Sequence, residues 1–296
     1  MNNEICKLCG THTTLKESHI VPKSIYKWLK DTSATGYMRN LTNPNVRSQD
    51  GIKMYLLCEN CEQKFSIYEK WFKEKVFLPA NDQNSIGIEK PLVFNYDDKL
   101  FYFIISVWWR TIQFSMTDKE LQDSKYWDLI IKCEKELKEF LTIFQYPINF
   151  DEVYLLPVGY IRYAPPHLKK LNTFLTRSIR PFIMFDDESC FFSLKIPSLW
   201  FFGNLEGVSK FAMGKTKINP SGGIFNSKGL TTSEVHISNF MQQQSHAFIK
   251  RAEEISENQR NIIIKDMQKN PDRLAQSKSA EALHLDHLRD SLNKDE

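Results

Sequence analysis

Two Cys-x-x-Cys pairs constrain the fold of this chain more than any other feature of its sequence. The first pair is Cys6 and Cys9, and the second is Cys58 and Cys61. Each pair puts two thiol groups on one tight turn, and two such turns complete the tetrahedral shell that zinc prefers. Neither pair lies in the βαβ context of a thioredoxin-like redox motif. We therefore expect all four cysteines to bind one structural zinc ion; the alternative is two unrelated cysteine pairs.

The stretch between the two pairs is longer than the ~15–20 residues of a simple zinc ribbon, so something folded must fill it. It contains Ser18-His19-Ile20-Val21-Pro22 soon after the first pair. The second pair begins a helix, because apolar side chains then recur at three- and four-residue steps. Pro79 and the polar run at 81–85 are expected to end this helix. The apolar positions are Phe65, Tyr68, Trp71, Phe72 and Val76.

The order of these motifs resembles the zinc-knuckle HNH endonucleases, which are ββα-metal (His-Me finger) nucleases. The likeness rests on C-x-x-C, then S-H-I-V-P, then L-L-C-E-N-C-E-x-K, and covers roughly residues 4–75. It implies an α+β protein whose residues 1–79 form a treble-clef-like ββα zinc domain. It also implies that the four thiolates bind structural zinc and that His19 is the general base of phosphodiester hydrolysis. The imidazole pKa of ~6.5 suits that role. A catalytic Mg²⁺ or Mn²⁺ ion would assist it.

Three positions depart from the family pattern. Ser18 stands where many members have Asp or His, and Lys53 stands where an Asn is expected. Glu62 replaces the His that usually follows the second knuckle. Glu is a good oxygen ligand for Mg²⁺, so Glu62 is expected to bind the catalytic ion, whereas Ser18 is a weak ligand. An N-terminal helix carboxylate also gains from the helix dipole without any metal, which is the alternative for Glu62.

The missing Asn leaves His19 without an obvious orienting partner. The insert between the knuckles offers Asn45, Gln49 and Asp50 for that contact, and the sequence does not choose among them. The alternative for His19 is a buried histidine that braces the zinc fold. Glu69, on the knuckle helix, is either a group that supports the site or half of a surface pair with Lys73.

Basic residues near the motif are candidates for DNA binding. The first 79 residues hold 12 Lys/Arg and 8 Asp/Glu, whereas the whole chain has a net charge of +3. This mild excess permits a nucleic-acid partner without requiring one. A solvated charged surface is the alternative for these residues. The candidates for phosphate contact are Lys23, Lys27, Arg39 and Lys53.

Residues 80–149 read as a helical connector. The run from Leu100 to Phe114 is apolar nearly all round, so this helix should be central and buried. Arg110 lies within it and needs a partner if buried, which we interpret as a contact that docks the nuclease-like domain on the rest. Residues 126–144 form an amphipathic helix. Cys133 and Cys190 are expected to be small buried hydrophobic residues.

Residues 150–296 are expected to form an α+β domain. Short apolar runs broken by Pro, Asp and Gly indicate an antiparallel sheet, with a helix around 167–173. From about Ser238 the chain becomes polar and helical, and beyond Lys269 it is expected to contribute little core. His284 and His287 are better explained by a surface helix than by metal binding. A targeting, sensing or partner-binding role is expected here, and the chain can also form an oligomer.

The leading hypothesis is a metal-dependent DNA endonuclease. The N-terminus lacks an apolar signal segment and no run reaches the ~18–20 apolar residues of a membrane span, so a cytoplasmic protein without a membrane partner is expected. Many bacterial nucleases of this kind act in restriction or phage defence, and the resemblance extends to such a role. One alternative is a non-catalytic zinc-dependent nucleic-acid-binding protein. Another is a protein-interaction scaffold stabilised by zinc.

Overall fold

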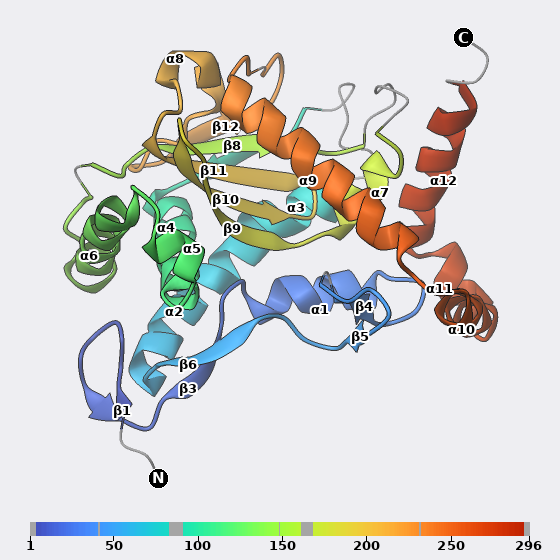
Figure 1. Cartoon of the computed structure of the whole chain (residues 1–296), viewed down its shortest axis with the longest axis horizontal. Helices are drawn as coiled ribbons and strands as arrows, with labels where there is room; N and C mark the ends of the chain where they lie inside the picture. The colour runs from blue at the N-terminus through green and yellow to red at the C-terminus, as the bar shows by residue number, and fades with distance from the viewer. Residues whose placement is uncertain are drawn as a thin grey trace.

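Small antiparallel sheets and many helices make up the molecule, as Figure 1 shows. About half of the chain is helical, so the architecture is a mixed α/β one. In Figure 1 the largest sheet lies above the N-terminal elements, and the C-terminal helices run along the sheet toward them. The computed structural model describes residues 4–40, 42–82, 91–147, 149–160, 168–230 and 232–292.

The N-terminal region is built around one strand pair and the helix that follows it. Strand β3 (Lys16–His19) pairs antiparallel with β6 (Lys53–Leu57). Helix α2 (Glu59–Phe72) begins directly after β6, with Cys58 as its N-cap residue. His19 is the last residue of β3, so it lies at the end of the paired region. The other elements of this region are β1 (Glu4–Ile5), β2 (His12–Thr13), α1 (Lys23–Asp31), β4 (Met38–Arg39) and β5 (Arg47–Ser48).

The knuckle helix does not end at Pro79, which corrects the expectation from the sequence. A π-helical turn, Lys73–Phe77, follows α2 and leads into α3 (Leu78–Asp82), which contains Pro79. Proline lacks an N–H donor and crowds the carbonyl of the preceding turn, and a π turn is a common place for a helix to absorb such a misfit. Val76 and Phe77 are fully buried, so packing holds the extended helix together. Part of the polar run, residues 83–85, lies outside the described residues.

The central helix is buried, as its sequence predicts. In α4 (Asp98–Ser115) every residue from Leu100 to Ile112 is buried, although Phe114, near its end, is exposed. Helix α6 (Trp127–Ile143) packs against α4 through the apolar face that its periodicity predicts. The short helix α5 (Lys119–Gln122) connects the two.

A four-stranded antiparallel sheet, in the order β8-β11-β10-β9, follows the helices. The predicted antiparallel character of this part of the chain is therefore confirmed. Its strands read as apolar runs because both faces are covered: Trp108 of α4 stacks on Phe192, while Phe240 packs against Phe191 on the other face. The strands are β8 (Val153–Pro157), β9 (Arg180–Phe185), β10 (Cys190–Ile196) and β11 (Leu199–Glu206), and β7 (Val93–Tyr96) pairs separately with β12 (Gly223–Asn226).

The C-terminal helices are docked on the protein, but they add little hydrophobic core beyond Lys269, as expected: Ala282 is the one buried apolar residue there among the described residues. The last helix packs on α7 (Leu171–Arg177), and its residues Ala282 and Asp286 are buried. The helix expected around 167–173 begins at Leu171, and residue 167 lies outside the described residues. The remaining helices are α8 (Lys210–Met213), α9 (Val235–Glu253), α10 (Glu257–Gln268), α11 (Pro271–Ala275) and α12 (Lys278–Leu292).

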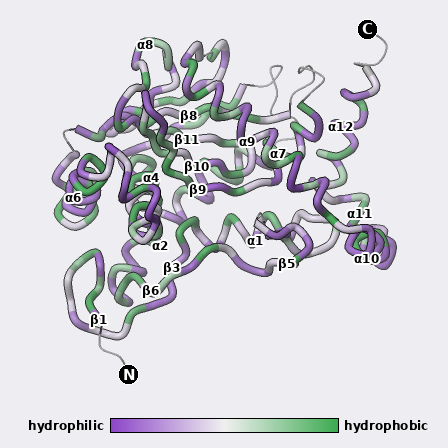
Figure 2. The backbone as a smooth tube through the Cα atoms, viewed as in Figure 1, coloured by the Kyte–Doolittle hydropathy of each residue, from purple (hydrophilic) through white to green (hydrophobic). Residues whose placement is uncertain are grey.

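One large cluster of buried side chains runs from the cysteine knuckles through α2 and α4 into the sheet. Figure 2 shows the contrast between these hydrophobic segments and the hydrophilic α10, which buries no residue. The proposed division into residues 1–79, 80–149 and 150–296 stays a prediction. Among the described residues, no helix is both long and apolar enough to cross a membrane.

Candidate metal centre and the adjacent histidine

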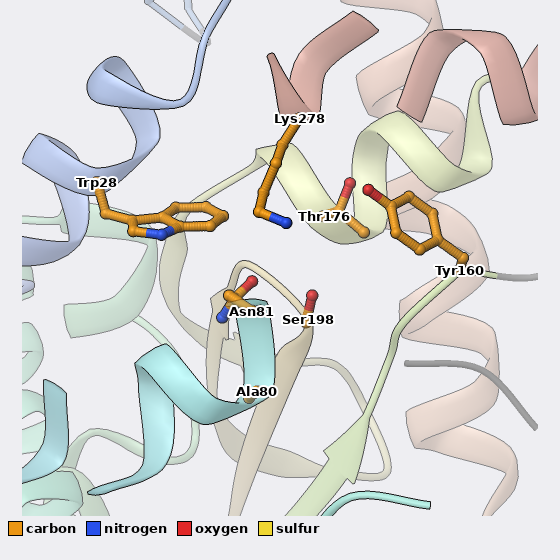
Figure 3. Close-up of a pocket in the computed structure, with 7 residues that line it drawn as sticks. All are labelled: Trp28, Ala80, Asn81, Tyr160, Thr176, Ser198 and Lys278. Atoms are coloured by element: carbon orange, nitrogen blue, oxygen red, sulfur yellow. The ribbon is translucent and has the colours of Figure 1, made fainter. Parts of the chain in front are cut away.

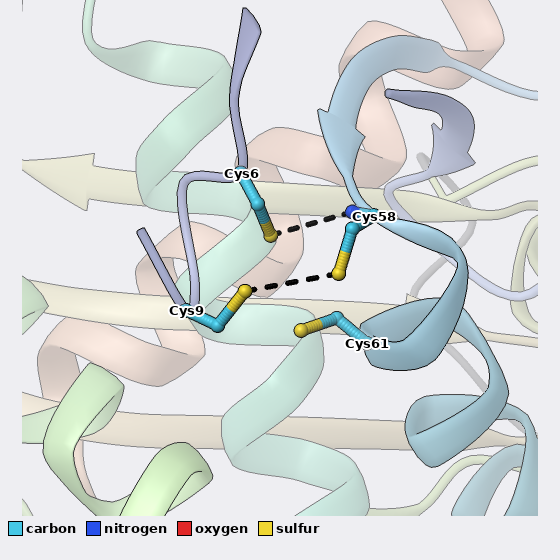
Figure 4. A group of neighbouring side chains, drawn as sticks. All are labelled: Cys6, Cys9, Cys58 and Cys61. Carbon is cyan, nitrogen blue, oxygen red and sulfur yellow. Dashed lines mark hydrogen bonds between the residues drawn. The ribbon is translucent and has the colours of Figure 1, made fainter. Parts of the chain in front are cut away.

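The four cysteines of the two C-x-x-C pairs meet at one point. Cys6 and Cys9 lie on the turn between β1 and β2, while Cys58 and Cys61 lie at the N-terminus of α2 (Figure 4). Their Sγ atoms all lie within 4.8 Å of one another, and those of Cys9 and Cys58 are 3.7 Å apart. Four sulfurs ~2.3 Å from a tetrahedral zinc ion are ~3.8 Å apart, so the spacing fits zinc.

Local backbone contacts hold the two knuckles together. The N–H of Cys58 donates to Sγ of Cys6 over 3.3 Å, and the N–H of Lys7 donates to the carbonyl of Leu56. Gly10 has a φ of 76°, a left-handed conformation that glycine adopts without strain and that closes the first knuckle. These contacts bring the two sequence pairs into register across the intervening insert.

The protonation chemistry of the cluster also fits a cation. Burial raises the pKa of Cys58, and burial together with the neighbouring thiols raises that of Cys61. Burial opposes ionisation of Cys9 as well, but contacts with Thr11 outweigh it and lower the Cys9 pKa to about 6. Because like charges so close repel, four thiolates need a bound cation to coexist. The predicted cluster of four cysteines is thus present, and its four sulfur ligands are the set found in structural zinc sites.

His19 has a carboxylate partner from the insert. Its Nε2 lies 2.7 Å from Oδ1 of Asp50, and its side chain is 15% exposed. Of the three insert residues that the sequence offered, Asp50 is the one that reaches His19. The backbone N–H of Gly51 also donates to Asp50 Oδ1 over 2.9 Å. Burial raises the pKa of Asp50, but the hydrogen bonds from His19 and Gly51 and the nearby charges lower it to about 2.

Lys53 supports this pair and is not free for a phosphate. Its Nζ lies 2.6 Å from Glu17 and 3.3 Å from Asp50. It stands where the family pattern has the orienting Asn and is the strand partner of His19, while its side chain is linked to the histidine ring through Asp50. The side chain that reaches the His19 ring belongs to Asp50, three residues before Lys53 in the chain.

Ser18 of β3 and Glu62 of α2 contact each other. The Ser18 hydroxyl donates a short hydrogen bond to Oε1 of Glu62. Ser18 is fully buried, while Glu62, in the first turn of α2, is partly exposed. Two of the three positions that depart from the family pattern thus bring two oxygen atoms together.

Arg110 links the histidine strand to the interior. Its guanidinium donates from Nη1 to the carbonyl of His19 over 2.7 Å and to Oε1 of Glu69 over 2.8 Å. The predicted need for a partner is therefore met by two partners. Glu69 pairs with Arg110 rather than with Lys73. The sequence signal was an arginine inside an apolar helix, which indicated a partner without identifying it.

The other basic candidates differ in whether their side chains already have partners within the protein. Lys23 is exposed at the start of α1, and the described residues give it no ion pair. Lys27 is exposed and pairs with Asp31 in the same helix. Arg39 instead donates to the carbonyl of Pro44 and to Gln259 of α10, so it joins the insert to the C-terminal helices. Trp28 is buried and packs edge-on against Phe77.

A small pocket lies where α1, α3, α7 and α12 approach one another (Figure 3). The indole of Trp28 and the amine of Lys278 face each other across it. About 10 Å³ is open to the centre of a water-sized molecule, so the pocket holds about one water and no nucleotide. It contains none of the candidate site residues.

His284 and His287 do not form a metal site with other side chains. Within the described ranges, the four cysteines are the one group of three or more metal-ligating side chains close enough to share an ion. Between the two histidines lies Asp286, whose buried carboxylate accepts hydrogen bonds from backbone N–H groups of α7. Cys133 and Cys190 are fully buried and apart from the cluster, as expected.

Comparison with known families, with curated proteins and with solved structures finds no match for this chain.

Proposed function

We propose that this protein is a metal-dependent endonuclease that hydrolyses phosphodiester bonds of DNA, with His19 as general base. The observation that carries the proposal is the hydrogen bond between His19 and Asp50, at the end of the β3–β6 pair away from Cys58. The β3–β6 pair followed by α2 supports a treble-clef-like ββα unit, in which zinc braces the frame. The proposal accordingly assigns catalysis to the histidine and structure to the zinc.

The contact with Asp50 selects the atom that acts as base. A carboxylate that accepts from Nε2 favours the tautomer with its proton on that nitrogen, which leaves Nδ1 as the acceptor. Nδ1 then takes a proton from a water molecule as the water oxygen attacks phosphorus. The imidazolium that forms is stabilised by the Asp50 carboxylate, and the phosphodiester bond breaks with departure of the opposite oxygen.

The oxygen pair of Ser18 and Glu62 suits a hard divalent cation. Mg²⁺ commonly binds one or two protein oxygens and completes its shell with water and substrate phosphate. We propose that Glu62 holds such an ion with its carboxylate and that Ser18 contributes its hydroxyl. When bound, the ion supplies positive charge against the developing charge on the phosphate and the leaving oxygen.

Lys23 and Lys27 are the preferred phosphate contacts of the four basic candidates. Both side chains are exposed on α1, which follows directly on the His19 strand. Lys53 and Arg39 are engaged with other residues of the protein. We therefore propose that the DNA backbone runs along α1 and that Lys53 and Arg39 have positioning roles.

Plasmid cleavage tests the proposal directly. Supercoiled DNA with Mg²⁺ or Mn²⁺ should be nicked or linearised by the wild type, and His19→Ala should be slower by about 10²-fold or more. His236→Ala, on α9, is the matched control and should cleave like the wild type. If the wild type cleaves no faster than His19→Ala, the enzyme proposal is wrong.

The second candidate is a non-catalytic zinc module that binds nucleic acid. It is favoured by Ser18, because a hydroxyl replaces an acidic or imidazole ligand and already occupies the Glu62 carboxylate. It predicts a gel shift that wild type and His19→Ala share and that weakens steeply with salt. A zinc-stabilised scaffold predicts no salt-dependent affinity for nucleic acid. Protein partners or oligomers formed through the C-terminal region stay predictions.

A further inference from the structure

We infer that Arg110 is a positioning residue of the proposed active site: its buried guanidinium fixes the backbone of His19 at a set distance from helix α2. This inference rests on the proposed function for its kinetic consequence. Its structural half, the control of His19 by a residue of α4, can be tested even in a protein that cleaves nothing.

One guanidinium group, that of Arg110, donates hydrogen bonds to strand β3 and to helix α2. Arg110 Nη1 lies 2.7 Å from the His19 carbonyl oxygen and 2.8 Å from Glu69 Oε1. The Arg110 side chain is 2% exposed and that of Glu69 is 22% exposed. Nε donates back to the carbonyl of Ser106 over 3.1 Å, which holds the side chain in one orientation on α4. The guanidinium also lies 5.2 Å from the ring centroid of Phe65.

Burial makes this contact consequential. A charged group removed from water is costly unless it is paired and hydrogen-bonded, so Arg110 is held strictly to the few acceptors within reach. Those acceptors are the backbone of the proposed base, the Glu69 carboxylate of α2 and Ser106 of its own helix. Neighbouring residues of α4 are apolar and buried, and Trp108 of the same helix stacks on the sheet, so the anchor itself is rigid.

The second acceptor lies on the helix that carries the proposed metal ligand. Glu69 follows Glu62 by seven residues on α2, which is about two helical turns, so both lie on one side of the helix. Arg110 therefore ties the strand of the base to the helix of the ligand. A misplacement of about 1 Å between such groups can cost ~10²-fold in rate, which is why the spacing matters for turnover.

Substitution by lysine separates this role from a general effect on stability. Arg110→Lys keeps the charge, but its ammonium lacks the Nε and Nη2 donors that bond Ser106 and hold the side chain in one orientation toward both acceptors. We expect kcat for plasmid cleavage to fall by about 10- to 100-fold, with KM and the zinc content unchanged. Arg289→Lys is the matched control, because Arg289 is an equally buried arginine beside a carboxylate, Asp286, on α12. It should lose stability without losing kcat.

A second readout does not depend on activity. In protein labelled with ¹⁵N-histidine, the imidazole signals of His19, assigned by their loss in His19→Gln, report its hydrogen bond to Asp50. They should shift in Arg110→Lys and stay in place in Arg289→Lys. If a folded, zinc-loaded Arg110→Lys protein keeps both the His19 signals and kcat, the inference is wrong.

The two proposals fail in different ways. A wild type that cleaves no DNA overturns the proposed function, while the His19 signals still decide the role of Arg110. If Arg110→Lys does not fold, Glu69→Gln takes its place, because it removes the charge partner and leaves the shape. Glu69→Gln should shift the His19 signals in the same direction by a smaller amount, and unchanged signals in that variant contradict the inference.

Discussion

The Nε2 atom of His19 lies 2.7 Å from Oδ1 of Asp50, a residue 31 positions later in the chain. The contact joins the end of β3 to the turn that precedes β6, so it depends on the pairing of those two strands. It also makes the histidine a hydrogen-bonded member of a pair rather than a lone buried ring. Any chemistry at His19 is therefore coupled to the charge of Asp50.

The first prediction concerns acid stability and Asp50. Burial raises the Asp50 pKa, but the hydrogen bonds from His19 and Gly51 and the nearby charges outweigh it and hold the pKa in the folded protein at about 2, below its ordinary value of 3.8. A carboxyl whose pKa is depressed by folding contributes stability above its unfolded pKa and loses it as pH falls through the folded pKa. The side chain is 33% exposed, so solvent screening reduces the contribution to about 1 kcal/mol.

Denaturation between about pH 5 and pH 2 measures this contribution. The difference in unfolding free energy between the wild type and Asp50→Asn should shrink as pH falls from about 4 to about 2. Asp187→Asn, in the exposed turn between β9 and β10, should follow the wild-type pH dependence. A difference for Asp50→Asn that is independent of pH would contradict the assignment.

The second prediction concerns zinc. Metal analysis after dialysis should find about one zinc per chain, and the double variant Cys58→Ser/Cys61→Ser should have none. A chelator should lower the melting temperature of the wild type, because metal binding stabilises only the folded site. Cys133→Ala should keep its zinc, since Cys133 is buried away from the cluster. Equal zinc in the wild type and the double variant would refute a shared site.

The parts of the site that could be predicted from the sequence are those set by local spacing. A C-x-x-C turn brings two thiols together whatever surrounds it, so the cluster could be predicted from two short motifs. The buried α4 and the amphipathic α6 follow in the same way from periodicity. The partner of His19 could be narrowed to three residues of the insert, because the family pattern places an orienting Asn ahead of the second knuckle and this chain has Lys53 there.

Long-range contacts and local adjustments of the backbone could not be predicted from the sequence. Arg110 signalled the need for a partner, but the choice of the His19 carbonyl depends on how α4 lies across β3, which periodicity does not encode. Pro79 predicted a helix end, but a π-helical turn before it lets the helix continue through it. Asp286 sits in a polar segment that reads as solvent-exposed, yet its partners lie on α7, more than 100 residues away. Polarity alone cannot distinguish a solvated carboxylate from a buried one that caps another helix.

The third prediction follows from that buried carboxylate. Asp286 accepts hydrogen bonds from the backbone N–H groups of Asn172 and Thr173, over 2.8 and 3.0 Å, and from the Thr173 hydroxyl over 2.7 Å. It thus caps the N-terminus of α7 from a different helix. Asp286→Ala should lower the free energy of unfolding by about 3 kcal/mol, because it removes a cap and leaves Arg289 without its buried carboxylate.

Urea denaturation compares Asp286→Ala with Asp290→Ala. Asp290 pairs with the same arginine, but its side chain is 38% exposed, so its loss should cost less than about 1 kcal/mol. The two variants share the charge change and the helix, and differ in burial. Equal losses in the two would show that Asp286 does not cap α7.

The fourth prediction tests the contact between α4 and the sheet, on which the placement of Arg110 depends. A Cβ atom added at Gly203 would lie 2.3 Å from Cη2 of Trp108, whose ring stacks on Phe192 at a centroid distance of 5.2 Å. Gly203→Ala should therefore destabilise the protein by about 2 kcal/mol through overpacking.

Trp108→Phe makes room at that point but costs stability by leaving a cavity. In the double variant the added methyl group occupies the vacated space, so its cost should be less than the sum of the single costs by about 1 kcal/mol or more. Additive losses in this double-mutant cycle would mean that α4 does not pack on β11 through these two residues, and the anchor proposed for Arg110 would then lose its support.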